Sequence, residues 1–195
     1  MLPIQSNQEY SERSFNSLEI LKQTRTSIDF TECTFNKCDF SETKFSGCIF
    51  EKCIFKNCNL SNIKLPESKL IDCTFEDSKI IGVDWNNLST EMGLKLNCIN
   101  CDLSYSLFLE INISESKLEG CKIYESDFSN TILKKSSFKG SDFLRTKFFN
   151  TDLRECDFTE SKNYFFNPGD NKCKGSKFNQ PEVLTLLESF GIKIE

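Results

Sequence analysis

The chain has 195 residues and a mass of 22.5 kDa, which allows one domain or two small ones with a sizeable core. Its net charge of −5 comes from 29 acidic and 24 basic side chains, which excludes a basic nucleic-acid-binding protein. The chain does not open with a basic segment followed by an apolar run, and it has no run of about eighteen apolar residues. We therefore expect no signal peptide, no membrane span and a cytoplasmic location.

The first 27 residues only partly follow the pattern that dominates the rest of the chain. Tyr10, Phe15 and Ile20 are large apolar residues spaced by five, and Arg25 then interrupts the series. We predict that residues 1–27 form an irregular N-terminal cap.

Residues 28–85 carry an unbroken period of five. From Phe30 to Trp85 every fifth residue is large and apolar, and the residue two places earlier is usually cysteine, serine, threonine or a β-branched residue. A helix repeats every 3.6 residues or so and a strand about every two, so neither fits alone. The period indicates a short extended stretch followed by a corner, in which the large residue and its small companion point inward. The remaining positions are mostly polar, as corners and outward positions in water should be.

Such a chain satisfies its backbone hydrogen bonds by coiling, so that each coil stacks on the last with a rise of about 4.8 Å. If four units make one coil, inward residues twenty apart form columns through the interior. We expect the thiols to fill narrow sites beside the rings as reduced, buried, apolar groups. The predicted core stack of this segment is Phe35, Phe55 and Phe75 with Cys33, Cys53 and Cys73.

Residues 86–100 fit the period poorly, and the second series, which begins at Leu103, is shifted by three residues from the first. Two interpretations stay open for this segment. It is either a protruding loop that contacts a partner, with Met92 and Leu94 as contact residues, or a packed connector between two stacks. The usual role of such loops favours the connector.

Residues 101–162 form the second repeat segment, with Phe108, Phe128 and Phe148 as its predicted core stack. In residues 163–178, Pro168 and Gly169 indicate a turn, and we predict a loop on the last coil. Tyr164 and Phe165 either form an exposed partner-binding patch or cover the open end of the stack, and we favour the second role.

Residues 179–195 are predicted to form a C-terminal helix and tail. Asn179 suits the N-cap, Pro181 the first turn and Gly191 the position after the helix. A terminal helix can cover the last coil and can also join two copies of the chain by a two-fold contact. We predict a homodimer through this helix, with contacts from Leu184, Leu187, Phe190 and Ile192.

Residues that carry catalytic chemistry are scarce. The chain contains no histidine and no glycine-rich phosphate-binding motif. Cys98 and Cys101 have the spacing of a redox or metal-binding pair, but both fall in inward slots, so we expect a core role. We predict that the protein is not an enzyme and has no catalytic, cofactor-binding or metal-binding residues.

Several segments resemble the A(D/N)LXX units of pentapeptide repeat proteins, among them "CDFSETKFSG", "CDLSYS" and "SDFSNTILKKSSFKGSDF". The resemblance implies an all-β fold, a right-handed quadrilateral β-helix in two stacked segments with a short C-terminal α-helix. The layout is similar to that of the Qnr and MfpA type, whose members bind type II DNA topoisomerases as mimics of duplex DNA. It therefore implies DNA gyrase or topoisomerase IV as a partner.

Two functions from different classes follow. The protein is either a DNA-mimicking rod that binds a topoisomerase, or a structural scaffold or binding module for another protein partner with no topoisomerase role. Duplex DNA carries one charge per ~1.7 Å, so mimicry needs acidic side chains gathered along one face. Alternating signs along the rod would favour the second function. Neither reading involves direct binding to nucleic acid or to a membrane.

Overall fold

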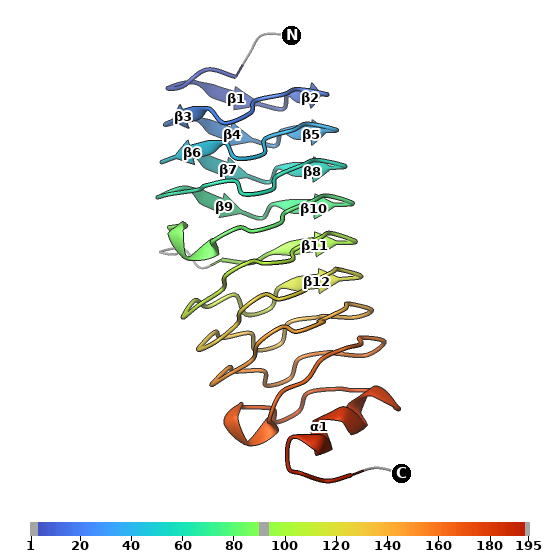
Figure 1. Ribbon diagram of the computed structural model, residues 1–195. Helices are drawn as coiled ribbons and strands as arrows, with labels where there is room; N and C mark the ends of the chain where they lie inside the picture. The colour runs from blue at the N-terminus through green and yellow to red at the C-terminus, as the bar shows by residue number, and fades with distance from the viewer. Residues whose placement is uncertain (1–3, 90–93, 194–195) are drawn as a thin grey trace.

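The computed structural model describes residues 4–89 and 94–193, which form a rod of stacked coils (Figure 1). The first coil lies at one end of the rod and the C-terminal helix α1 at the other. The all-β right-handed quadrilateral β-helix that the sequence predicts is confirmed. Its strands are β1 (Glu9–Ser11), β2 (Ser14–Asn16), β3 (Thr24–Thr26), β4 (Asp29–Thr31), β5 (Thr34–Asn36), β6 (Lys44–Ser46), β7 (Ile49–Glu51), β8 (Ile54–Lys56), β9 (Lys69–Ile71), β10 (Thr74–Glu76), β11 (Asn97–Ile99) and β12 (Lys117–Glu119).

The coils have four faces, which we name by what stacks on them. The β1 face holds β1, β4, β7 and β9, and the β2 face holds β2, β5, β8, β10, β11 and β12. The β3 face begins with β3 and β6 and continues through the single bridges that join Asp84, Leu107, Asp127 and Lys147. The bridge face consists of single bridges that run from Glu19 to Lys162. All of these pairings are parallel.

Residues twenty apart pair within the first segment, as the predicted four-unit coil requires. Phe35 lies between Phe15 and Phe55 on the β2 face, and Phe50 follows Phe30 on the β1 face. Large inward residues and their small companions are buried over most of the rod, while Tyr10, Leu18, Ile111, Cys173 and Phe178 are partly buried against the same core. The core is therefore a continuous column of apolar side chains along the rod.

The break in the period is one longer coil. Phe75 pairs with Cys98 and Lys79 with Asp102, so this coil has 23 residues instead of twenty. The three extra residues account for the shift between the two series, and β10 and β11 belong to the same sheet. The two segments therefore form one continuous hydrogen-bonded stack.

Asn86 maintains the backbone ladder where this coil departs from the repeat. Residues Trp85–Asn87 form a 3-10 turn, so the backbone of Asn86 is not extended alongside the next coil. The side-chain amide of Asn86 makes the hydrogen bonds to the next coil instead. Its Oδ1 accepts from the Leu109 N–H at 3.0 Å, and its Nδ2 donates to the Leu109 carbonyl. One side chain thus replaces two backbone groups at the junction.

The corners have a backbone conformation that the sequence pattern did not predict. The second residue after each large inward residue has a φ near +50° to +60°, as at Glu32, Lys52 and Asn130. This left-handed region costs a non-glycine residue about 1–2 kcal/mol. The stacked hydrogen bonds of both neighbouring coils offset this cost at every corner.

The C-terminal helical segment is shorter than predicted. A 3-10 turn at Glu182–Leu184 leads into α1 (Thr185–Glu188), and Gly191 follows with a φ of +74°. The prediction that Asn179 caps the helix is wrong. Its Oδ1 accepts from the Glu160 N–H at 2.6 Å, so the side chain holds the last coil and not the helix.

Candidate interaction surface

The predicted core stacks lie in the interior and are not available to a partner. Phe35 stacks on Phe55 with ring centroids 4.7 Å apart, and Phe55 stacks on Phe75 at 4.9 Å. In the second segment Phe108, Phe128 and Phe148 stack at 4.4 and 5.3 Å. Cys33, Cys53 and Cys73 are buried beside the first stack.

The cysteines are free thiols, and all except the half-buried Cys173 are buried. Each small-slot thiol donates to a backbone carbonyl of the previous coil, for example from Cys58 to Phe35 at 3.3 Å and from Cys156 to Leu133 at 3.0 Å. Burial raises the pKa of Cys156 to about 12 and also raises the pKa of Cys33 and Cys48. These thiols are poor nucleophiles at neutral pH. Within the described residues no group of three or more cysteine or carboxylate side chains is placed to hold a metal ion.

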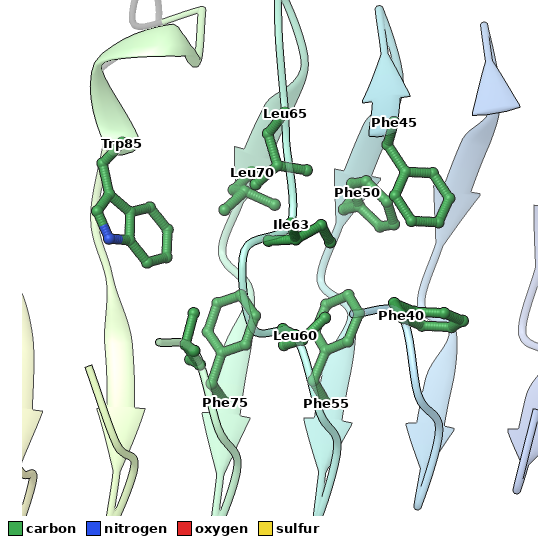
Figure 2. Close-up of a pocket in the computed structure, with 11 residues that line it drawn as sticks. Phe40, Phe45, Phe50, Phe55, Leu60, Ile63, Leu65, Leu70, Phe75 and Trp85 are labelled. Atoms are coloured by element: carbon green, nitrogen blue, oxygen red, sulfur yellow. The ribbon is translucent and has the colours of Figure 1, made fainter. Parts of the chain in front are cut away.

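One small cavity lies inside the first segment, where leucine replaces phenylalanine in the large slot. Its volume is about 20 Å³. Figure 2 shows Leu60, Leu65 and Leu70 between the phenylalanine rings of the preceding coil and Trp85. The lining is apolar, so the cavity is a packing defect and not a ligand site.

The outer surface is organised by ion pairs between neighbouring coils. In seven pairs the two partners are twenty residues apart, so opposite charges stand one above the other. Both partners are exposed in five of the pairs, while Asp127 and Asp142 are half-buried, and an exposed pair contributes at most about 1 kcal/mol. The pairs are Lys22–Glu42, Lys52–Glu32, Lys56–Glu76, Lys95–Glu115, Arg145–Glu125, Lys147–Asp127 and Lys162–Asp142.

Each face is close to neutral as a result. We counted each described charged side chain with the five-residue unit that contains it. The β1 face carries nine acidic and nine basic groups, the β2 face five and five, the β3 face five and four, and the bridge face six and five. The described part of the rod therefore has no face that gathers acidic groups along its length. Spacing of opposite charges by twenty would have indicated this from the sequence alone.

An exposed apolar surface on the second segment was not predicted. Tyr105, Leu107 and Phe149 are 41–60% exposed. The half-buried Leu109 lies on the same coil as Tyr105 and Leu107, and Phe149 lies two coils further along the rod. Residues 105, 107 and 109 are three successive outward positions that are all apolar. That run is a departure from the polar outward pattern and could have been recognised in the sequence.

The structure changes the interpretation of the predicted partner-binding loops. Leu94 is buried and packs in the core, which is the connector role, and Met92 lies outside the described residues. Tyr164 is also buried, because its ring packs against Phe158 and Phe178 at the end of the stack. The prediction that Leu94 and Tyr164 could contact a partner at the surface is therefore wrong. Phe165 is 55% exposed.

The C-terminal residues divide between the core and the surface. Leu186 is buried and covers the last coil together with Val183. Leu187, Phe190 and Ile192 are exposed, and Leu184 is half-buried. An apolar strip of this kind at the end of a rod is an unusual exposure for a monomer. No helix within the described residues has the length and apolar character needed to cross a bilayer.

Comparison with known proteins identifies the repeat. A family model described as "Pentapeptide repeat region" matches residues 28–98, and a second, "Pentapeptide repeats (8 copies)", matches residues 97–134 and 133–162. No curated protein matches the chain.

Among solved structures, a trypsin-treated variant of QnrB1, described as a plasmid-mediated fluoroquinolone resistance protein, aligns with a TM-score of 0.75. The sequence identity is 18%, and the alignment covers 98% of this chain and 100% of that one. Full-length QnrB1 aligns with a TM-score of 0.53 at 20% identity, over 94% and 100% of the two chains. At these identities the likeness concerns the fold.

Proposed function

Because the chain belongs to the pentapeptide repeat family, we propose that it is a non-enzymatic rod that binds another protein through its outer surface. The fold alone does not give the function of such a rod, so we infer the class of partner from the charge and the apolar residues of its outer surface. The interior holds rings and thiols that are buried and closed off from substrate. The free cysteines fit a reducing compartment, and we place the protein in the cytoplasm.

The observation that carries the proposal is the balance of charge on every face. A rod of about 40 Å that copied duplex DNA would present on the order of twenty charges of one sign. No face of the described rod differs from neutrality by more than one charge, and the ion pairs between coils cancel the acids locally. The exposed apolar side chains of Tyr105 and Leu107 on one coil, and of Phe149 two coils further on, instead fit a protein partner with an apolar surface.

The second candidate partner is a type II topoisomerase, DNA gyrase or topoisomerase IV. It is favoured by the likeness of layout to QnrB1 along the whole rod, including the C-terminal end. The charge balance argues against it, since the acidic face that mimicry requires is lacking among the described residues. We therefore favour a different protein partner.

Gyrase supercoiling separates the two candidates. The purified chain is added in increasing amount to gyrase and relaxed plasmid, with and without ciprofloxacin. We expect neither inhibition of supercoiling nor protection from the drug at micromolar protein. Either effect would replace the favoured candidate with the topoisomerase. Bovine serum albumin at equal mass controls for non-specific protein effects.

We further propose that two copies associate through the C-terminal segment. Leu187, Phe190 and Ile192 project from the end of the rod, while Leu186 on the same segment is taken up by the core. The exposed residues exceed what is needed to cover one coil. A two-fold contact would bury the same strip on both copies.

A further inference from the structure

The β1 face is neutral as a whole, but its two ends carry opposite charge. At the N-terminal end, residues 9–13, 29–33 and 49–53 contain five acidic and two basic groups, a net charge of −3. At the C-terminal end, residues 132–136, 152–156 and 172–176 contain five basic and two acidic groups, a net charge of +3. Between these ends Lys69 and Asp72 cancel, as do Lys95 and Glu115.

At both ends like charges also stand one above the other, although Glu32 pairs with Lys52. Lys134, Arg154 and Lys174 follow one another at intervals of twenty, so three cations stack on successive coils. At the other end Glu12 and Glu32 stack in the same way. Like charges one coil apart repel each other, which costs stability, and the same arrangement also occurs at Lys44 and Lys64 and at Glu19 and Asp39. Within the chain Lys134 pairs with Glu155, Arg154 with Asp152 and Glu32 with Lys52, so an external partner would meet the net charge that remains at each end.

The geometry points to a second copy of the chain as that partner. We propose that the β1 faces of two copies pair in antiparallel orientation, so that the acidic end of each lies on the basic end of the other. The two-fold axis would pass through the neutral middle of the face. The two columns match in spacing, because both repeat at the rise of one coil, about 4.8 Å.

The size of the face sets the strength of this contact. A face about 40 Å long and 10 Å wide gives a total of about 800 Å² for two copies, below the usual range for stable complexes. The contact is therefore weak and reversible, it forms at high protein concentration, and salt screens it. It is distinct from the apolar C-terminal contact, which salt does not weaken.

Charge reversal at each end tests the proposal. A basic-end variant carries Lys134→Glu, Arg154→Glu and Lys174→Glu, and an acidic-end variant carries Glu9→Lys, Glu12→Lys and Glu32→Lys. We expect each variant alone to lose the salt-sensitive association that the native chain shows by sedimentation velocity at high concentration. An equimolar mixture of the two variants should regain it, because one face is then acidic throughout and the other basic.

A matched control reverses Lys79 and Lys122 to glutamate on the bridge face, and should leave the association unchanged. Circular dichroism checks that every variant keeps its fold. Self-association of both variants at the native level, or a mixture that stays apart, would overturn the proposal. So would a native chain that shows no salt-sensitive association at high concentration, whether or not it binds a short DNA duplex through Lys134, Arg154 and Lys174.

Discussion

At the residue scale, the interior is governed by the fit between large and small slots. Where phenylalanine gives way to leucine, at Leu60, Leu65 and Leu70, the column is underfilled and a cavity of about 20 Å³ remains (Figure 2). Stacked rings elsewhere in the column lie 4.4–5.3 Å apart. A ring at one of these leucine positions would restore the stack.

We predict that Leu65→Phe raises the free energy of unfolding by about 0.5–1 kcal/mol, since the ring fills the cavity between Phe45 and Trp85. Urea unfolding followed by circular dichroism measures the change. The control is Leu133→Phe, at a fully buried position that does not line the cavity, where overpacking should cost about 1–3 kcal/mol. Equal losses from both substitutions would show that the cavity does not accept a ring.

The buried thiols give the fold a dependence on alkaline pH. Burial raises the pKa of Cys156 from 9.0 to about 12. A raised pKa in the folded state favours folding while the thiol is protonated in both states. As pH rises from about 9 towards 12, the unfolded state loses its proton first, and the free energy of unfolding falls. We predict a smaller fall for Cys156→Ala over this range, measured by urea unfolding in the presence of reductant. Parallel curves would contradict the assignment.

At the element scale, the long coil and the C-terminal segment are where the repeat stops specifying the structure. The period of five was sufficient to predict the coil, its inward pairs and the shift of three residues between the two series. It could not predict that the Asn86 amide replaces a backbone pair, because this depends on a local 3-10 turn. Nor could helical propensity predict that Asn179 would bind the last coil.

We predict that Asn86→Ala destabilises the chain by about 1–2 kcal/mol, since two hydrogen bonds to Leu109 are lost where the coils join. The control is Asn36→Ala, which removes one side-chain bond to Asn16 and should cost less than about 0.5 kcal/mol. Urea unfolding and hydrogen exchange at the Leu109 amide measure the effect. Unchanged protection of that amide would show that Asn86 is not needed for the junction.

The C-terminal segment makes a separate prediction about association. Leu187→Glu combined with Phe190→Glu should leave the fold of each chain unchanged by circular dichroism, because both side chains are exposed. The same variant should lose the salt-insensitive dimer by light scattering. Leu186→Ala is the counterpart, because Leu186 is buried, and we expect it to lower stability by about 2–3 kcal/mol. A dimer that survives the double substitution would place the contact elsewhere.

At the scale of the whole molecule, function depends on how charge is distributed over four faces. The sequence predicted the rod and left two partner classes open, since net charge does not show which groups share a face. The regular coil contains twenty residues and one coil contains 23. Once these lengths are known, the charge of each face can be counted from the residue numbers. The burial of Leu94 and Tyr164 required the structure, because loop residues do not follow the period.

Adding acidic charge to one face should create the acidic face that mimicry of duplex DNA requires and that the described part of the native rod lacks. Along the bridge face, Lys79, Lys122 and Lys162 alternate with carboxylates at Asp102 and Asp142. We predict that Lys79→Glu, Lys122→Glu and Lys162→Glu together produce a rod that inhibits gyrase supercoiling, since the face then carries acids on successive coils. The same three lysines changed to glutamine provide the control for loss of positive charge alone.

The most direct test of the charge-balance account is the binding of the native chain and this triple glutamate variant to immobilised DNA gyrase, with linear duplex DNA as competitor. The account predicts that the native chain does not bind, and that the variant binds and is displaced by the duplex. Binding of the native chain that the duplex displaces would contradict the account, because it would mean that a neutral rod surface can occupy the DNA site.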